Sequence, residues 1–69
     1  MKTKTVIISI SDLTPEAIPI LSQALKDVPG VETVDFNLER KVAAVDFDPQ
    51  RSNIDHLLRA VLKAGYKVL

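Results

Sequence analysis

Residues 33–47, TVDFNLERKVAAVDF, decide the fold, because their alternation of apolar and polar residues predicts a β-hairpin. With Glu39 and Arg40 as a two-residue turn, one register brings the apolar residues of both strands to one face. That register pairs Val34 with Val45, Phe36 with Ala43 and Leu38 with Lys41. The turn contains neither Gly nor Asn, so a longer loop is the alternative.

Two further strands are predicted near the chain ends. Residues 5–10, TVIISI, alternate and are mostly β-branched, which is typical of a half-buried strand. Gly65 is a typical left-handed helix stop, and residues 66–69 after it predict a short closing strand.

Amphipathic helices separate these strands. The first has an apolar stripe at three- and four-residue spacing: Ala17, Leu21, Ala24, Leu25 and Val28. Because proline lacks an N–H, we expect residues 14–18 to form a separate turn and the regular helix to begin near Pro19. It ends before Pro29. The second helix is capped by Ser52 or Asn53, and its predicted buried stripe is Ile54, Leu57, Leu58, Val61 and Ala64.

The element order βαββαβ predicts a single α+β domain over residues 1–69 with the ferredoxin-like sandwich fold. We expect a four-stranded antiparallel sheet of order 4-1-3-2 with both helices on one face. This topology gathers the first loop (residues 11–14), the hairpin turn (39–41) and residues 65–66 at one end. The Pro29-Gly30 turn and residues 48–53 lie at the other end.

Composition excludes several functions. The chain has no cysteine, which removes thiolate metal sites, cysteine nucleophiles and disulfides. Nine basic residues balance nine acidic ones, so no basic stripe is available for nucleic acid or a membrane surface. No apolar run approaches the roughly 20 residues of a membrane span, so we expect no membrane insertion. The N-terminal MKTKT shows no small-residue cleavage site, so we expect a cytoplasmic domain.

No enzyme chemistry is predicted either. The first loop has no arginine and no glycine with which to hold phosphate, and no Ser-His-Asp arrangement occurs. The outward faces of the first and third strands lack the aromatics that stack RNA bases; they carry Thr5, Ile7, Ser9, Val42, Ala44 and Asp46. We therefore expect no catalytic residues and no cofactor.

The whole chain resembles the heavy-metal-associated domain of copper chaperones, mercury-binding proteins and the N-terminal modules of copper and zinc P-type ATPases. The resemblance is carried by residues 5–14, by 23–31 with Val-Pro-Gly-Val, by 45–49 with Phe-Asp-Pro, and by Ala64-Gly65-Tyr66. It implies the ferredoxin-like fold and a metal-transport setting, with a metal-transport ATPase, a chaperone or a neighbouring domain as partner.

The family binds soft ions through Met-Thr-Cys-x-x-Cys in the first loop, and this chain lacks both cysteines. Counted forward from Leu13, the cysteine positions fall on Pro15 and Ile18; counted back from Pro29, they fall on Thr14 and Ala17. The counts differ by one, which indicates a one-residue shortening. Because Ala17 leads the apolar stripe, we expect Thr14 and Ala17 to be the better positions for restored cysteines. No metal ligand is predicted in either register.

The resemblance implies a non-catalytic docking or regulatory module in metal-ion transport or copper homeostasis. Its partner-docking surface would lie at the loop end and comprise Asp12, Leu13, Thr14, Pro15, Glu16, Arg40, Lys41 and Tyr66. The alternative is a divergent metal-ion carrier that uses oxygen ligands or ligands shared with a partner. A third possibility is that the cysteines were replaced by design.

Other candidates are weaker. His56 is the lone histidine, begins the second helix and is predicted to lie far from the first loop. Asp46, Asp48 and Asp55 suit a weak hard-cation site, but Asp48-Pro49 is more simply a strand exit. Tyr66 is expected to cover the core. A small apolar patch on the open sheet face, Ile7, Val42 and Ala44, suits a weak homodimer.

Overall fold

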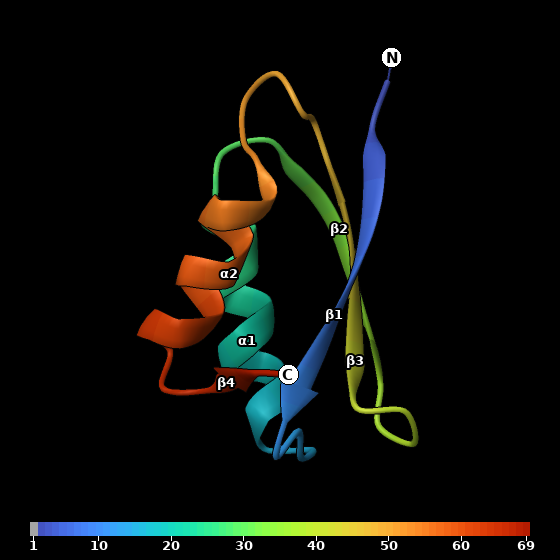
Figure 1. The fold of residues 1–69 in the computed structure, drawn as a ribbon, viewed down its shortest axis with the longest axis vertical. Coiled ribbons are helices and arrows are strands. Elements are labelled where there is room, and N and C mark those ends of the chain that lie inside the picture. Colours follow the sequence, from blue (N-terminus) through green and yellow to red (C-terminus); the bar gives the residue numbers. More distant parts are fainter. Residues whose placement is uncertain (1) are drawn as a thin grey trace.

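A computed structural model describes residues 2–69 and contains six elements (Figure 1). These are β1 (Lys4–Ser11), α1 (Ala17–Lys26), β2 (Val31–Asn37), β3 (Val42–Phe47), α2 (Ile54–Lys63) and β4 (Lys67–Val68). The strands form one antiparallel sheet of order β2-β3-β1-β4, and both helices cover the same face (Figure 1). The predicted ferredoxin-like fold and its strand order are confirmed.

The β2–β3 hairpin has the predicted register, with Val34 opposite Val45 and Phe36 opposite Ala43. Its connection is longer than the two-residue turn, because β2 ends at Asn37 and β3 begins at Val42. The Asn37 side chain accepts the Arg40 backbone N–H at 3.0 Å, and Lys41 has a left-handed φ of 58°. Leu38 consequently lies in the turn and is 41% exposed, so its predicted place in the core-facing set is wrong.

Helix α1 begins two residues earlier than expected, at Ala17, so the predicted start at Pro19 is wrong. The Ala17 N–H donates to the Thr14 carbonyl at 3.0 Å, which closes a turn directly ahead of the helix. Pro19 is the third helical residue, where an N–H has no intrahelical acceptor, so the ring removes no hydrogen bond. No side chain caps this helix start.

Helix α2 starts with a reciprocal cap. The Asn53 side chain accepts the His56 N–H at 3.0 Å, and His56 Nδ1 accepts the Asn53 N–H at 3.3 Å. The buried Ser52 hydroxyl lies 3.1 Å from the same Nδ1. Because Nδ1 accepts from the backbone, the hydroxyl donates to it and the ring proton sits on Nε2. His56 therefore has a structural role at this helix start.

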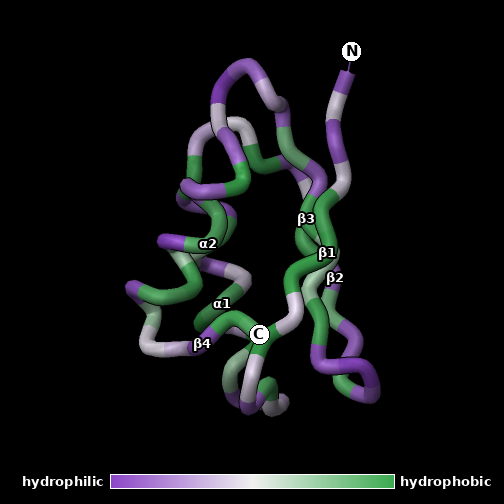
Figure 2. The backbone as a smooth tube through the Cα atoms, viewed as in Figure 1, coloured by the Kyte–Doolittle hydropathy of each residue, from purple (hydrophilic) through white to green (hydrophobic). Residues whose placement is uncertain are grey.

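The core lies between the sheet and the helices, and Figure 2 shows hydrophobic stretches along β1, β3 and both helices. Its largest fully buried side chains are Ile10, Leu21, Leu25, Val45, Leu57 and Val61. Most predicted core positions are buried or half-buried as expected. Ile54, the first residue of α2, is an exception at 49% exposed.

The two ends of the molecule carry the loops that the topology predicts. The β1–α1 loop, the hairpin turn and the α2–β4 junction lie at one end, and the α1–β2 and β3–α2 connections lie at the other (Figure 1). At the second end Gly30 has φ 87°, and a Cβ there would lie 2.8 Å from Arg51 Cβ. The close approach allows Asp48 to donate its N–H to the Gly30 carbonyl at 2.9 Å.

Candidate functional site

The loop between β1 and α1 is anchored at one residue and exposed at the next three. Asp12 turns the chain out of β1 with a left-handed φ of 62°. Leu13 then inserts into the core with 5% exposure, while Thr14, Pro15 and Glu16 are exposed. The loop therefore presents a short, fixed surface to solvent at the start of α1.

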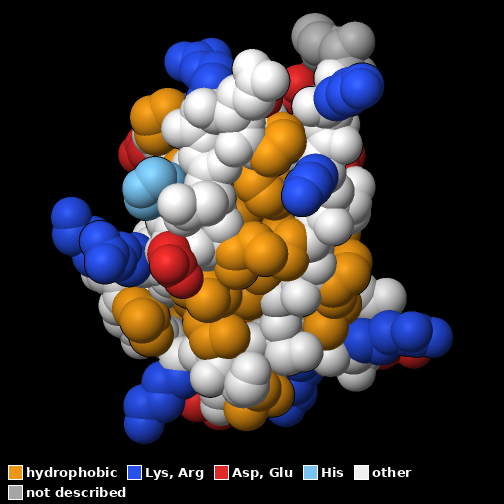
Figure 3. Space-filling view, turned by 45° about the horizontal axis from the view of Figure 1, so that its top comes forward, with side chains coloured by type: hydrophobic (Ala, Val, Ile, Leu, Met, Phe, Trp, Pro, Cys, Tyr) orange, Lys and Arg blue, Asp and Glu red, His pale blue; other side chains and the backbone are white. Residues whose placement is uncertain are grey.

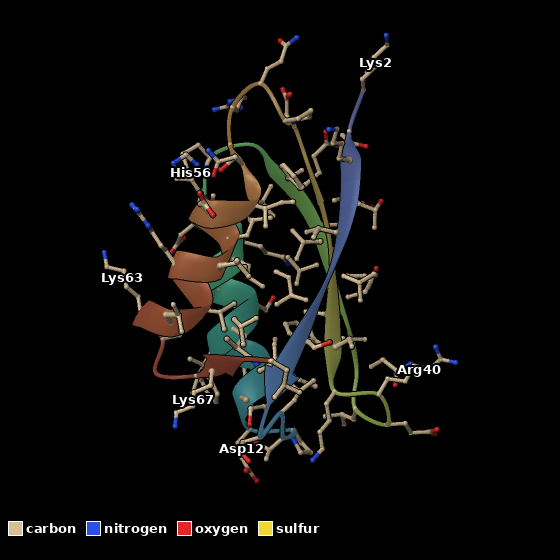
Figure 4. All side chains as sticks on the ribbon, in the orientation of Figure 1. Lys2, Asp12, Arg40, His56, Lys63 and Lys67 are labelled. Carbon is tan, nitrogen blue, oxygen red and sulfur yellow. The ribbon has the colours of Figure 1, made fainter. Side chains whose placement is uncertain are left out.

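The hairpin turn lies at the same end, joined to β1 by the Ile10 N–H, which donates to the Lys41 carbonyl at 2.8 Å. Arg40 and Lys41 are both exposed. Figure 4 shows the Arg40 side chain extending away from the body of the domain, on the opposite side from Asp12. The structure brings the two loops together at one end, but it does not bring the Arg40 and Asp12 side chains together.

Tyr66 is half-buried and packs against the core, which agrees with the expected covering role. Lys67 follows it on β4, where it pairs with Ser11 next to Asp12. Figure 4 places Lys67 and Asp12 at the same end. Sequence reasoning missed Lys67, although the pairing of a closing strand with the end of the first strand could have indicated it.

The positions of the absent cysteines differ in exposure. Pro15 is exposed and Ile18 is half-buried, whereas Thr14 is exposed and Ala17 is 0% exposed. A cysteine at residue 17 would direct its sulfur into the core, away from an ion bound at the surface. The 0% exposure of Ala17 argues against the expected pair, Thr14 and Ala17, and in favour of Pro15 and Ile18; the choice between them stays a prediction.

Other ligand types do not gather into a site. Within residues 2–69, no group of three or more His, Cys, Asp or Glu side chains is placed to hold a metal ion. His56 and Asp12 lie at opposite ends of the domain (Figure 4). The Asp48 carboxylate accepts the Gln50 N–H at 2.9 Å, which is the predicted strand-exit turn.

Asp46 is held on the open face of the sheet by hydroxyls from both neighbouring strands. Thr5 on β1 donates to Oδ1, and Thr33 on β2 donates to Oδ2 at 2.8 Å. These two hydrogen bonds favour the charged form and lower the pKa of Asp46. The carboxylate therefore links three strands.

Comparison with known proteins agrees with the fold described above. The chain belongs to the heavy-metal-associated domain family, whose model matches residues 21–67. The matched region begins after the first loop, where this chain lacks the cysteines. No helix within residues 2–69 has the length and apolar character needed to cross a membrane.

Individual relatives come from mercury and copper transport. The mercuric transport protein periplasmic component of Pseudomonas aeruginosa is 37% identical over 65 residues, which cover 93% of this chain and 71% of that protein. Oxidized MerP from Ralstonia metallidurans CH34 has a TM-score of 0.87 at 35% identity, covering 99% of this chain and 96% of that chain. The Cu(I)-loaded N-terminal domain of a potential copper-translocating P-type ATPase from Bacillus subtilis has a TM-score of 0.88 at 25% identity, covering 97% and 85%.

These relatives correct one prediction. The expected cytoplasmic location is contradicted, because relatives from Pseudomonas aeruginosa and Shigella flexneri are named periplasmic components. The expectation rested on the lack of a signal-peptide cleavage site near the N-terminus. A signal peptide is removed from the mature protein, so the residues of the folded domain do not report the location.

Proposed function

We propose that this domain serves metal-ion transport as a non-catalytic docking or regulatory partner and does not carry the ion itself. The observation that carries the proposal is an intact heavy-metal-associated fold in a chain of 69 residues without cysteine. The relatives named for mercuric transport support the setting.

The chemistry of the first loop supports the non-carrier role. Soft ions such as Hg(II) and Cu(I) select thiolate ligands, and hydroxyl or carboxylate oxygens suit hard ions instead. Neither possible pair of cysteine positions provides sulfur, since they hold Pro15 with Ile18 or Thr14 with Ala17. An ion of this kind would find no suitable ligand pair in this loop.

The same loop remains suited to contact with another protein. Its backbone is fixed by the buried Leu13 and by the turn that closes on Ala17, so little conformational entropy would be lost on binding. Exposed charges of both signs lie at this end of the domain, with Asp12 and Glu16 on the loop and Arg40 and Lys41 on the hairpin turn. Such a surface favours an oriented, salt-sensitive contact.

A divergent carrier is the second candidate. The exposed Thr14 and Glu16 oxygens would have to act together with ligands supplied by a partner. This reading predicts that an ion is bound only in the complex, whereas the docking reading predicts a complex that forms equally well without the ion.

Docking is tested by NMR titration of the labelled domain with the mercuric transport periplasmic component of Pseudomonas aeruginosa, metal-free and Hg(II)-loaded. We expect amide shifts confined to residues 12–14, 16, 39–41 and 66–67. The variant Arg40→Ala/Lys41→Ala should weaken them, and the control Arg59→Ala/Lys63→Ala, on exposed positions of α2, should not. Equal loss in both variants, or shifts elsewhere, would refute this docking surface; binding only with Hg(II) would favour the carrier.

A further inference from the structure

A groove lies along the two helices, where α1 and α2 run side by side (Figure 1). It has a volume of about 690 Å³, and its lining comes from the second half of α1, the turn after it, the loop before α2 and α2 itself. None of the buried core residues belongs to this lining. The groove therefore opens on the side of the helices that faces away from the core.

The floor of the groove is apolar and consists of small side chains. Ala24 and Val28 of α1 and Ala60 of α2 line it, and all three are half-buried. Two larger apolar side chains extend this surface. Leu62 lines the groove and is 56% exposed, and Ile20, one turn before Ala24 on the same side of α1, is 51% exposed. Apolar surface is thus left in contact with water along both helices.

Positive charge is concentrated on the α2 side of the groove. Arg59 and Lys63 stand one turn apart on α2, and Arg51 precedes the helix; all three line the groove and are exposed. Within residues 2–69, the lining holds a single acid, Asp27, whose carboxylate accepts a hydrogen bond from Gln23 Nε2 at 2.9 Å. The chain as a whole has nine basic and nine acidic residues, so this excess of positive charge is local.

His56 adds a neutral hydrogen-bond donor on the same side. Its Nδ1 accepts the Asn53 N–H in the helix cap, so the ring proton is on Nε2. Figure 4 shows His56 and Lys63 on the same side of α2, and Figure 3 shows the histidine near Lys or Arg side chains. The α2 side of the groove therefore presents a row of donors suited to carboxylates.

We propose that the groove binds an acidic amphipathic helix of a partner protein. The apolar residues of that helix cover the small residues of the floor, and its acids lie on the edge beside α2. Because Arg59 and Lys63 are four residues apart, they pair with two acids that are four residues apart on the partner helix. The edge beside Asp27 is neutral or basic. This inference goes beyond the proposed function and concerns a surface separate from the loop end.

The length of the row of donors favours a helix over a small anion. His56 and Lys63 are seven residues apart, which corresponds to about 10 Å along the axis of α2. A single phosphate or carboxylate group cannot contact both ends of this row. Two turns of a helix span the same length and present an acid on each turn.

A second copy of the chain offers no suitable helix. Within residues 2–69, both helices bury their apolar stripes, with Leu21 and Leu25 of α1 and Leu57 and Val61 of α2 fully buried. Between their ends, α1 has no acidic residue and α2 has only Asp55. The complementary helix must therefore come from another protein.

The test is an NMR titration of the isotope-labelled 69-residue protein with the end-capped peptide ELAQELQELKAELK. On a helix its leucines form one stripe, its glutamates lie along one edge and its lysines along the other. We expect amide shifts at Ala24, Val28, Arg59 and Ala60. Exchange of the glutamates and lysines in the peptide, or replacement of its leucines by glutamine, should abolish these shifts.

Two charge-reversed variants locate the contact. Arg59→Glu/Lys63→Glu should weaken binding of the peptide by at least about tenfold. The control Lys2→Glu/Lys4→Glu makes the same change in net charge at exposed positions before and at the start of β1, outside the groove, and should leave the affinity unchanged. Dispersed amide spectra of both variants establish that they fold.

Several results would overturn the proposal. These are no shifts at about 1 mM peptide, equal weakening by the two variants, or equal binding of the glutamine-substituted peptide. Phosphatidylglycerol vesicles are the remaining comparison. If they perturbed the same amides and the peptide did not, the groove would be assigned to a lipid surface instead.

Discussion

At the scale of single residues, Asp46 shows how one side chain joins three strands. Its carboxylate accepts hydrogen bonds from Thr5 and Thr33, one from each neighbouring strand, and its pKa is lowered by them. The interaction needs the charged carboxylate, so it contributes to stability only where Asp46 is ionised.

This arrangement predicts an acid-sensitive contribution to stability. Because the folded-state pKa lies below the unfolded value of about 3.9, the contribution is present above that value and is lost as pH falls through the folded pKa. Asp46→Asn should reduce the loss of unfolding free energy on acidification below about pH 5. Urea unfolding from pH 6 to 3 measures it. Asp35→Asn, on the same sheet face, is the control. If the unfolding free energy of Asp46→Asn fell with pH as steeply as that of the parent, the assignment would be contradicted.

Neighbouring leucines in α2 provide a second residue-scale prediction. Leu57 is fully buried and Leu58 is only half-buried against the core. Leu57→Ala should lower the free energy of unfolding by about 2–5 kcal/mol, and Leu58→Ala should lower it by less. Urea denaturation of both variants measures the difference. A larger loss for Leu58→Ala would mean that the α2 face in contact with the sheet is assigned wrongly.

At the scale of elements, the start of α1 determines where a metal site could be rebuilt. Residues 15 and 18 are joined by a backbone hydrogen bond that closes one turn, in which the Ile18 N–H donates to the Pro15 carbonyl at 3.4 Å. Pro15→Cys/Ile18→Cys should bind Cu(I) at least about tenfold tighter than Thr14→Cys/Ala17→Cys, because residue 17 is buried. Competition with a Cu(I) chelator measures both. The reverse order would show that α1 is rotated relative to the structure.

Element by element, the sequence was informative where packing dominates. The hairpin register followed from pairing Val34 with Val45 and Phe36 with Ala43, since a slip by one residue would expose both. Loop chemistry was less predictable: the hairpin loop is lengthened by the Asn37 side chain and by Lys41 in a left-handed conformation, and neither is a strong sequence signal.

The start of α1 and the burial of Ile54 could not be read from patterns alone. Pro19 is compatible with either the first or the third helical position, because neither N–H has an intrahelical acceptor. Ile54 belongs to the apolar stripe of α2, but it is the first residue of the helix and is 49% exposed. The docking surface at the loop end depends on a partner and stays a prediction.

At the scale of the whole molecule, folding should need no metal. The domain has an apolar core, and the part of the chain that the structure describes, residues 2–69, contains no buried ligand set that must be deprotonated or filled. The thermal unfolding midpoint should therefore be the same with EDTA, and with one equivalent of Cu(I) or Zn(II). A midpoint that falls with EDTA would reveal a structural ion.

The central claim is that this heavy-metal-associated domain keeps the family's fold without its ion-carrying site. The most direct measurement is the amount of Hg(II) retained by the domain against a thiol competitor, with Pro15→Cys/Ile18→Cys as the positive control. We predict that the 69-residue domain retains no Hg(II) while the control retains one equivalent. Retention of one equivalent by the cysteine-free domain would contradict the claim.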